Sequence, residues 1–161
     1  MSKDIKDKYE NLIKENIDKL EILKNNFQTI VTATKELKQI ENNIDNKNIR
    51  IILEYQNDFN KCIDNIKNIN KDYNNFIQEK YPNNYYEIIC SDALIDQKDL
   101  EKINNNKKEY DKIIENLLDN TSKTKINFNI VVIKIKKLLN NIISTLKVKF
   151  NYKNQDNNLI K

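Results

Sequence analysis

The residues of this sequence best suited to binding chemistry are the lysines near its C-terminal end. Residues 124–161 hold eight Lys and a single acidic residue, Asp156, whereas residues 1–123 hold 20 Lys and Arg against 23 Asp and Glu. On a helix, Lys134, Lys137 and Lys147 lie away from the apolar arc, a pattern typical of helices that bind anionic surfaces. The candidate residues for contact with an anionic partner are Lys134, Lys136, Lys137, Lys147, Lys149 and Lys153.

Two anionic partners fit these lysines, and a third interpretation needs no partner. An anionic membrane attracts each Lys by about 1 kcal/mol, and nucleic acid binds Lys through its phosphates with an affinity that falls steeply with salt. Against both, the segment contains no Arg, the residue preferred for bidentate phosphate contacts. The third interpretation is a solvated Lys face that reflects A/T-rich codons, because Asn, Ile and Lys make up 84 of the 161 residues.

The absence of Gly and His from the chain excludes several kinds of active site. Phosphate-binding loops, dinucleotide-binding turns and EF-hand loops need Gly, and the common nucleophile pairs and zinc sites need His. Chemistry based on carboxylates, Lys, Tyr or Cys remains compatible with the composition. Cys62 lies in an apolar stripe and is interpreted as a small buried hydrophobe. We therefore predict a non-enzymatic protein without metal, cofactor or small-molecule substrate.

Stretches with helical apolar periodicity supply the elements that must position the lysines. The clearest covers residues 49–80, where every heptad a and d position from Ile52 to Phe76 is apolar, aromatic or Cys. Asp96 with Asp99 resembles a capping box at the start of the third helix. The predicted helices cover about 3–46, 49–80, 97–119 and 125–150, and residues 153–161 are expected to be flexible.

The last of these segments admits two structures. Residues 126–130 and 146–150 alternate between apolar and polar, as in a β-hairpin over 126–152. The helical template fits better, because the apolar residues from Phe128 to Leu146 fill one arc without a polar residue inside it. We therefore predict an all-α chain, either an antiparallel four-helix bundle or a helical-hairpin coiled coil. A C-terminal β-hairpin is the alternative.

The first predicted helix is longer than the others. Residues 3–46 would span roughly 60 Å at 1.5 Å per residue, and the later helices roughly 35–45 Å. Either the helix breaks near residues 32–34, or it projects beyond the bundle with an apolar seam. Such a seam predicts homo-oligomerisation or the capture of another helix. Its candidate residues are Leu20, Leu23, Phe27, Ile30 and Leu37.

Together these patterns predict how the protein acts. We expect a scaffold, an assembly subunit or an intracellular effector that works through protein–protein contacts of its amphipathic helices. Binding of nucleic acid or of an anionic membrane by the basic segment is the alternative. The sequence contains no visible signal peptide and no run of about 18 apolar residues. The expected location is therefore the cytoplasm, where Cys62 and Cys90 stay reduced.

Overall fold

The computed structural model describes residues 3–38, 46–120 and 128–160, with side chains described for residues 4–27, 50, 52–116 and 131–150. These residues form helices joined by short connections, without a strand, so the predicted all-α class is confirmed. The helices are α1 (Lys3–Lys38), α2 (Asn46–Lys80), α3 (Tyr85–Asp92), α4 (Gln97–Asn120) and α5 (Phe128–Ile160).

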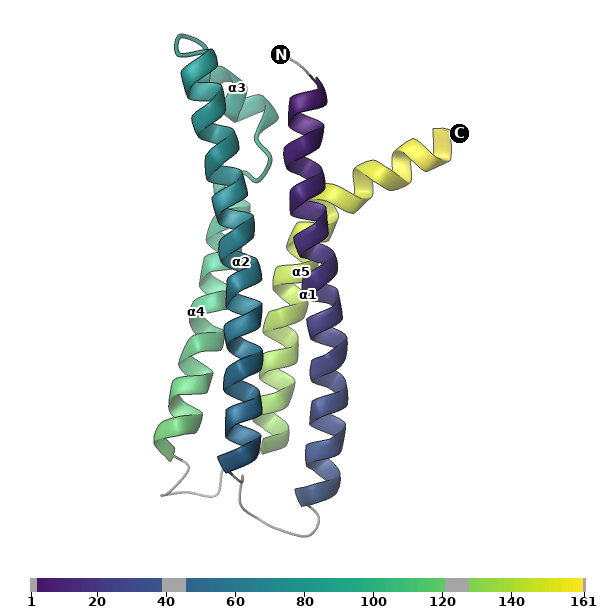
Figure 1. Cartoon of the computed structure of the whole chain (residues 1–161), viewed down its shortest axis with the longest axis vertical. Helices are drawn as coiled ribbons and strands as arrows, with labels where there is room; N and C mark the ends of the chain where they lie inside the picture. Colours follow the sequence, from purple (N-terminus) through teal and green to yellow (C-terminus); the bar gives the residue numbers. More distant parts are fainter. Residues whose placement is uncertain (1–2, 39–45, 121–127, 161) are drawn as a thin grey trace.

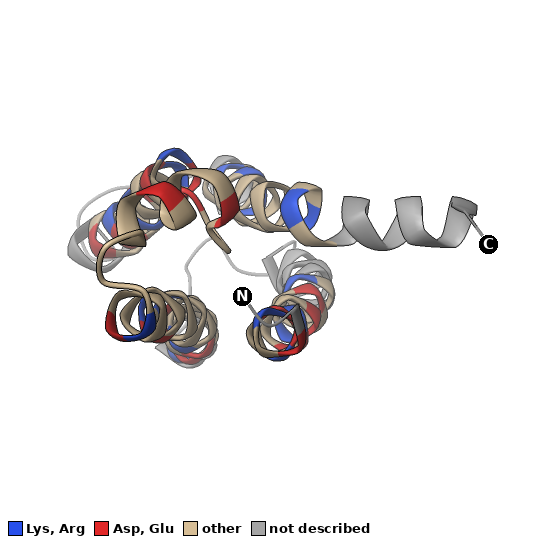
Figure 2. Cartoon of the chain, turned by 90° about the horizontal axis from the view of Figure 1, so that it is seen from above, with Lys and Arg blue, Asp and Glu red and all other residues tan. Residues whose placement is uncertain are grey.

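The four long helices form an antiparallel bundle (Figure 1). In the described part of the chain, α1 packs against α2 and α5, and α4 packs against α5 and, less closely, against α2. Each long helix therefore packs against two other long helices, and the helices surround one core when the bundle is viewed along its axis (Figure 2). The short helix α3 packs against α2.

The apolar stripes predicted for the long helices meet in the core of the bundle. On α2, the predicted positions from Ile52 to Tyr73 are buried, except Ile69, which is partly buried against the same core. On α1, Ile13, Ile17 and Leu20 face inward. Burial of such side chains is the main favourable contribution to folding, at about 1.5–3 kcal/mol for each fully buried Leu, Ile or Phe.

The alternative of a β-hairpin over 126–152 is wrong, because α5 is continuous through residues 128–160. Leu138, Leu139 and Ile142 on its apolar arc are buried, and Ile133, which the helical template places outside that arc, is 65% exposed. A hairpin would have put Ile133 on the same face as Ile135. The helical period places Ile135 in the core and Ile133 in solvent, as observed, whereas the alternating period would place both on one face. The flexibility expected for residues 153–161 stays a prediction.

The first helix does not break near residues 32–34, because α1 is continuous over Lys3–Lys38. α1 has 36 described residues and α2 has 35, so these two helices match in length within the described part of the chain, whereas α4 has 24. The β-branched residues at 29–34 cost at most about 0.7 kcal/mol each in helix propensity, which packing along the rest of the helix outweighs. The predicted helical residues 39–45 lie outside the described ones.

Three of the five residues proposed as a seam for an external helix pack within the chain itself. Leu20 and Phe27 have 0% and 3% of their surface exposed, and Leu23 packs partly buried against the same core. These three residues therefore bind the protein's own bundle and offer little surface to a further helix. The side chains of Ile30 and Leu37 lie outside the described set.

The connection from α2 to α4 contains the helix α3, which the sequence did not reveal, and its apolar residues pack on the core. Leu94 and Ile95 are buried there. The backbone N–H of Ile95 donates to the Oδ1 of the buried Asn70, 3.2 Å away. The predicted cap of α4 also forms, since the N–H of Asp99 donates to Asp96 Oδ1 at 2.8 Å.

Candidate functional site

The candidate lysines of α5 lie on different faces of the helix rather than on one. Lys134 and Lys137 are exposed on the side next to α4. Lys147 instead forms an ion pair with Glu21 of α1. Lys136 lies eleven residues before Lys147, close to three full turns, so it belongs to the same side of α5. Lys147 therefore lies on another side of α5 than Lys134 and Lys137, next to α1.

The other two candidates contribute less to a shared surface. Lys149 is partly buried, and the side chain of Lys153 lies outside the described set. Only Lys134 and Lys137 of the predicted six therefore come together at one described depression of the surface.

That depression is an open groove of about 490 Å³ between α4 and α5, which we call the α4–α5 groove. Its charged residues are exposed and form its walls, whereas Leu138 is buried and Ile113 half-buried, so these two form its floor. It is lined by Asn106, Glu109, Lys112, Ile113 and Asn116 of α4 and by Lys134, Lys137, Leu138 and Asn141 of α5. Three Lys against one Glu give the groove a net positive charge.

The register between α4 and α5 brings the lysines of the two helices together. Asn141 Nδ2 donates to Asn106 Oδ1 at 3.3 Å across the groove. Because the helices are antiparallel, residues that follow Asn106 on α4 lie opposite residues that precede Asn141 on α5, which places Lys112 in the same groove as Lys134 and Lys137. The sequence analysis did not find Lys112, because this pairing depends on the register between two helices.

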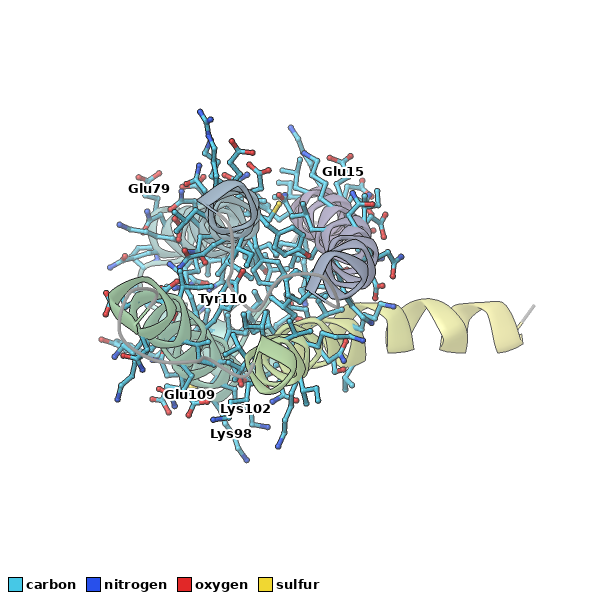
Figure 3. The ribbon with its side chains drawn as sticks, turned by 90° about the horizontal axis from the view of Figure 1, so that it is seen from below. Glu15, Glu79, Lys98, Lys102, Glu109 and Tyr110 are labelled. Atoms are coloured by element: carbon cyan, nitrogen blue, oxygen red, sulfur yellow. The ribbon has the colours of Figure 1, made fainter. Side chains whose placement is uncertain are left out.

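Further lysines extend the positive charge along α4. Lys98, Lys102 and Glu109 lie on the same outer side of the bundle, whereas Tyr110 lies toward its interior (Figure 3). Their spacing of four and seven residues is that of one helical face. The exposed outer side of α4 therefore carries Lys98 and Lys102 together with Glu109.

A second polar cluster lies between α2 and α4. Asp111 Oδ1 accepts hydrogen bonds from Gln56 Nε2 at 2.7 Å and from Asn60 Nδ2 at 3.1 Å. One turn away, Lys107 Nζ lies 3.4 Å from Asp64 Oδ1. Burial is the main cause that lowers the pKa of Lys67 in this cluster, and Lys107 adds to the effect while Asp64 and Asp111 oppose it. These groups bind one another across the interface, so they hold α2 and α4 together.

Two tyrosine hydroxyls are buried beside this cluster. In the described part of the chain, the hydroxyls of Tyr55 and Tyr110 have no hydrogen-bond partner. Burial raises the pKa of both phenols above the ordinary value of 10.0, with a further contribution from Tyr110 at Tyr55 and from Asp111 at Tyr110. A buried hydroxyl without a partner loses its hydration and gains nothing in return.

Replacing Tyr110 with Phe is therefore expected to leave stability unchanged or to raise the free energy of unfolding by about 1 kcal/mol. Urea denaturation followed by circular dichroism measures the change. Tyr86→Phe is the matched control, because 82% of the surface of Tyr86 is exposed. A loss of more than about 1 kcal/mol in Tyr110→Phe alone would show that the Tyr110 hydroxyl has a stabilising partner.

The groups with potential for other chemistry are few in the described residues. Both cysteines are free, and burial raises the pKa of the Cys62 thiol, which favours the unreactive thiol form. No group of three or more His, Cys, Asp or Glu side chains in the described set could hold a metal ion. No described helix has a stretch apolar and long enough to cross a bilayer.

Comparisons with family models, with curated proteins and with solved structures found no match to this chain. The candidate site therefore rests on the geometry of the α4–α5 groove.

Proposed function

We propose that this protein is a non-enzymatic helical bundle that acts through protein–protein contacts, with the α4–α5 groove as its binding surface for a negatively charged partner. The observation that carries the proposal is the convergence of Lys112, Lys134 and Lys137 over the apolar floor of Ile113 and Leu138. Protein interfaces combine an apolar centre with a polar rim in this way.

The lining of the groove favours a protein partner over nucleic acid. It contains Lys but no Arg and no aromatic side chain, whereas readers of bases and phosphates rely on Arg and on aromatic stacking. Binding to an anionic membrane remains the second candidate. It is favoured by Ile133 and Val148, two aliphatic residues that are largely exposed on the outer side of the same basic helix.

The test compares two double variants with the same change in net charge. Lys134→Glu/Lys137→Glu changes the groove, and Lys61→Glu/Lys71→Glu changes two exposed lysines of α2. The probe is a fluorescent glutamate-rich peptide, and the readout is anisotropy at physiological salt, with circular dichroism to confirm that both variants fold. We expect the groove variant to bind at least about tenfold more weakly than wild type, since two attractive pairs become repulsive. The α2 variant should bind nearly as wild type does.

Two results would overturn the proposal. One is equal binding of the peptide by both double variants, because the attraction would then depend only on net charge. The other is the absence of peptide binding by the wild type, combined with sedimentation on anionic phosphatidylserine vesicles that depends on Lys134 and Lys137. That second result would favour the membrane candidate.

A further inference from the structure

We infer that the ligand of the α4–α5 groove is an acidic amphipathic helix, with two aliphatic residues one turn apart and carboxylates on both sides of them. The inference rests on the proposed function and adds the conformation and side-chain pattern of the partner.

The backbone of the groove favours a helical ligand over an extended one. Both walls are α-helices, α4 and α5, whose interior N–H and C=O groups are already hydrogen-bonded within each helix. An extended peptide in such a groove finds few partners for its own backbone groups, because Asn106 and Asn141 already bind each other. A helical ligand satisfies its backbone internally and needs only side-chain contacts.

The dimensions of the groove fit two to three turns of helix. The lining spans residues 106–116 on α4 and 134–141 on α5, which correspond to about 15 Å and 10 Å at 1.5 Å per residue. The seam between two packed helices is also the surface on which the ridges of a third helix fit. The groove therefore accepts a short helix that lies along the bundle axis.

The floor and the outer rim define the apolar side of the ligand. Ile113 and Leu138 lie at the bottom of the groove. Ile133, with 65% of its surface exposed, extends the apolar surface on the outer side of α5. Aliphatic residues at positions i and i+4 of a ligand helix lie on one face, one turn apart, and would cover this surface.

The charges on the walls define the flanks of the ligand. The α5 wall carries Lys134 and Lys137, and the α4 wall carries Lys112 and Glu109. Carboxylates on both flanks of the apolar stripe would face lysines. The flank next to α5 would face two lysines and therefore carry more carboxylates than the flank next to α4, which would face one lysine. A membrane is flat and would not reach the floor between the two walls.

The experiment uses two fluorescent peptides of identical composition against the full-length protein. The first carries two Leu at i and i+4 with Glu on both flanks in an Ala background, and the second is a scramble that separates the Leu residues around the helix. We expect the amphipathic peptide to bind about tenfold more tightly than the scramble. Its helical circular dichroism signal should increase on binding.

Two aliphatic variants test which surface the peptide covers. Ile113→Ala removes part of the floor and should weaken binding of the amphipathic peptide about fivefold. Ile22→Ala, on the exposed face of α1, is the matched control and should leave it unchanged. Ile113 is only half-buried, so both variants are expected to fold.

The outcomes separate this inference from the proposed function. If both peptides bind equally and Lys134→Glu/Lys137→Glu still weakens both, the groove binds acidic chains but the helical pattern is refuted. If neither peptide depends on Lys134 and Lys137, the proposed function fails as well. Concentration-dependent self-association of the wild type that is lost in Lys134→Glu/Lys137→Glu would assign the groove to a second copy of this chain and overturn the inference.

Discussion

Replacing Phe59 with Ala is expected to lower the free energy of unfolding by about 3–5 kcal/mol, the usual cost of a Phe-to-Ala truncation in a packed core. Phe59 has no exposed surface, and its ring forms a T-shaped pair with the Tyr110 ring, with centroids 6.0 Å apart. This aromatic pair joins α2 to α4 close to the hydrogen bonds of Gln56 and Asn60 with Asp111. The loss is large against the total stability of about 5–15 kcal/mol of an ordinary domain.

Urea denaturation measured by circular dichroism tests this prediction. Ile133→Ala is the control, because Ile133 is largely exposed and its truncation should change stability by less than about 0.5 kcal/mol. Phe59→Leu retains most of the apolar volume and should lose less than Phe59→Ala, which keeps the test informative if the alanine variant unfolds. A loss below about 1 kcal/mol in Phe59→Ala would contradict the packing of α4 on α2.

The protein is also expected to unfold cooperatively in alkaline solution. Burial, with smaller contributions from Asp92 and Glu10, raises the pKa of Tyr73 from 10.0 to about 12. Burial raises the pKa of Tyr55 and Tyr110 as well. Above pH 10 the unfolded state has released these phenolic protons while the native state still holds them, so stability falls as the pH rises through this window.

Tyrosinate absorbance and the helical circular dichroism signal, recorded together against pH, measure this effect. The exposed Tyr86 should ionise near the ordinary pKa without loss of helix, whereas ionisation of the buried phenols should coincide with unfolding. Tyr110→Phe removes one of the buried phenols and should move the midpoint of unfolding to higher pH. Ionisation of all tyrosines in one step, with the helical signal intact, would show that these phenols are not buried.

The helices of the bundle could be predicted from the sequence because each buries one continuous apolar stripe. The stripe of α2 from Ile52 to Tyr73 has the same period in the sequence and in the core. Helix α3 was not predicted, since its eight residues are too few to define a period. The extension of the first helix over residues 39–45 stays a prediction, because these residues lie outside the described ones.

Only half of the candidate site could be predicted in the same way. Lys134 and Lys137 were visible because they lie outside the apolar arc of their own helix. Lys112 and Glu109 come from α4, and their place in the groove depends on the register that Asn106 and Asn141 share. The ion pair of Lys147 could not be predicted, because its partner Glu21 lies on α1 and periodicity within one helix contains no information about its neighbours.

The most direct test of the proposed function is amide chemical-shift mapping of the protein during titration with the acidic amphipathic peptide. The α4–α5 groove predicts shift changes concentrated in residues 106–116 and 134–141, the segments that line it. The same titration of Lys134→Glu/Lys137→Glu should show these changes only at much higher peptide concentration. Changes centred on α1 and α2, or no changes at all, would contradict the assignment of the groove as the binding surface.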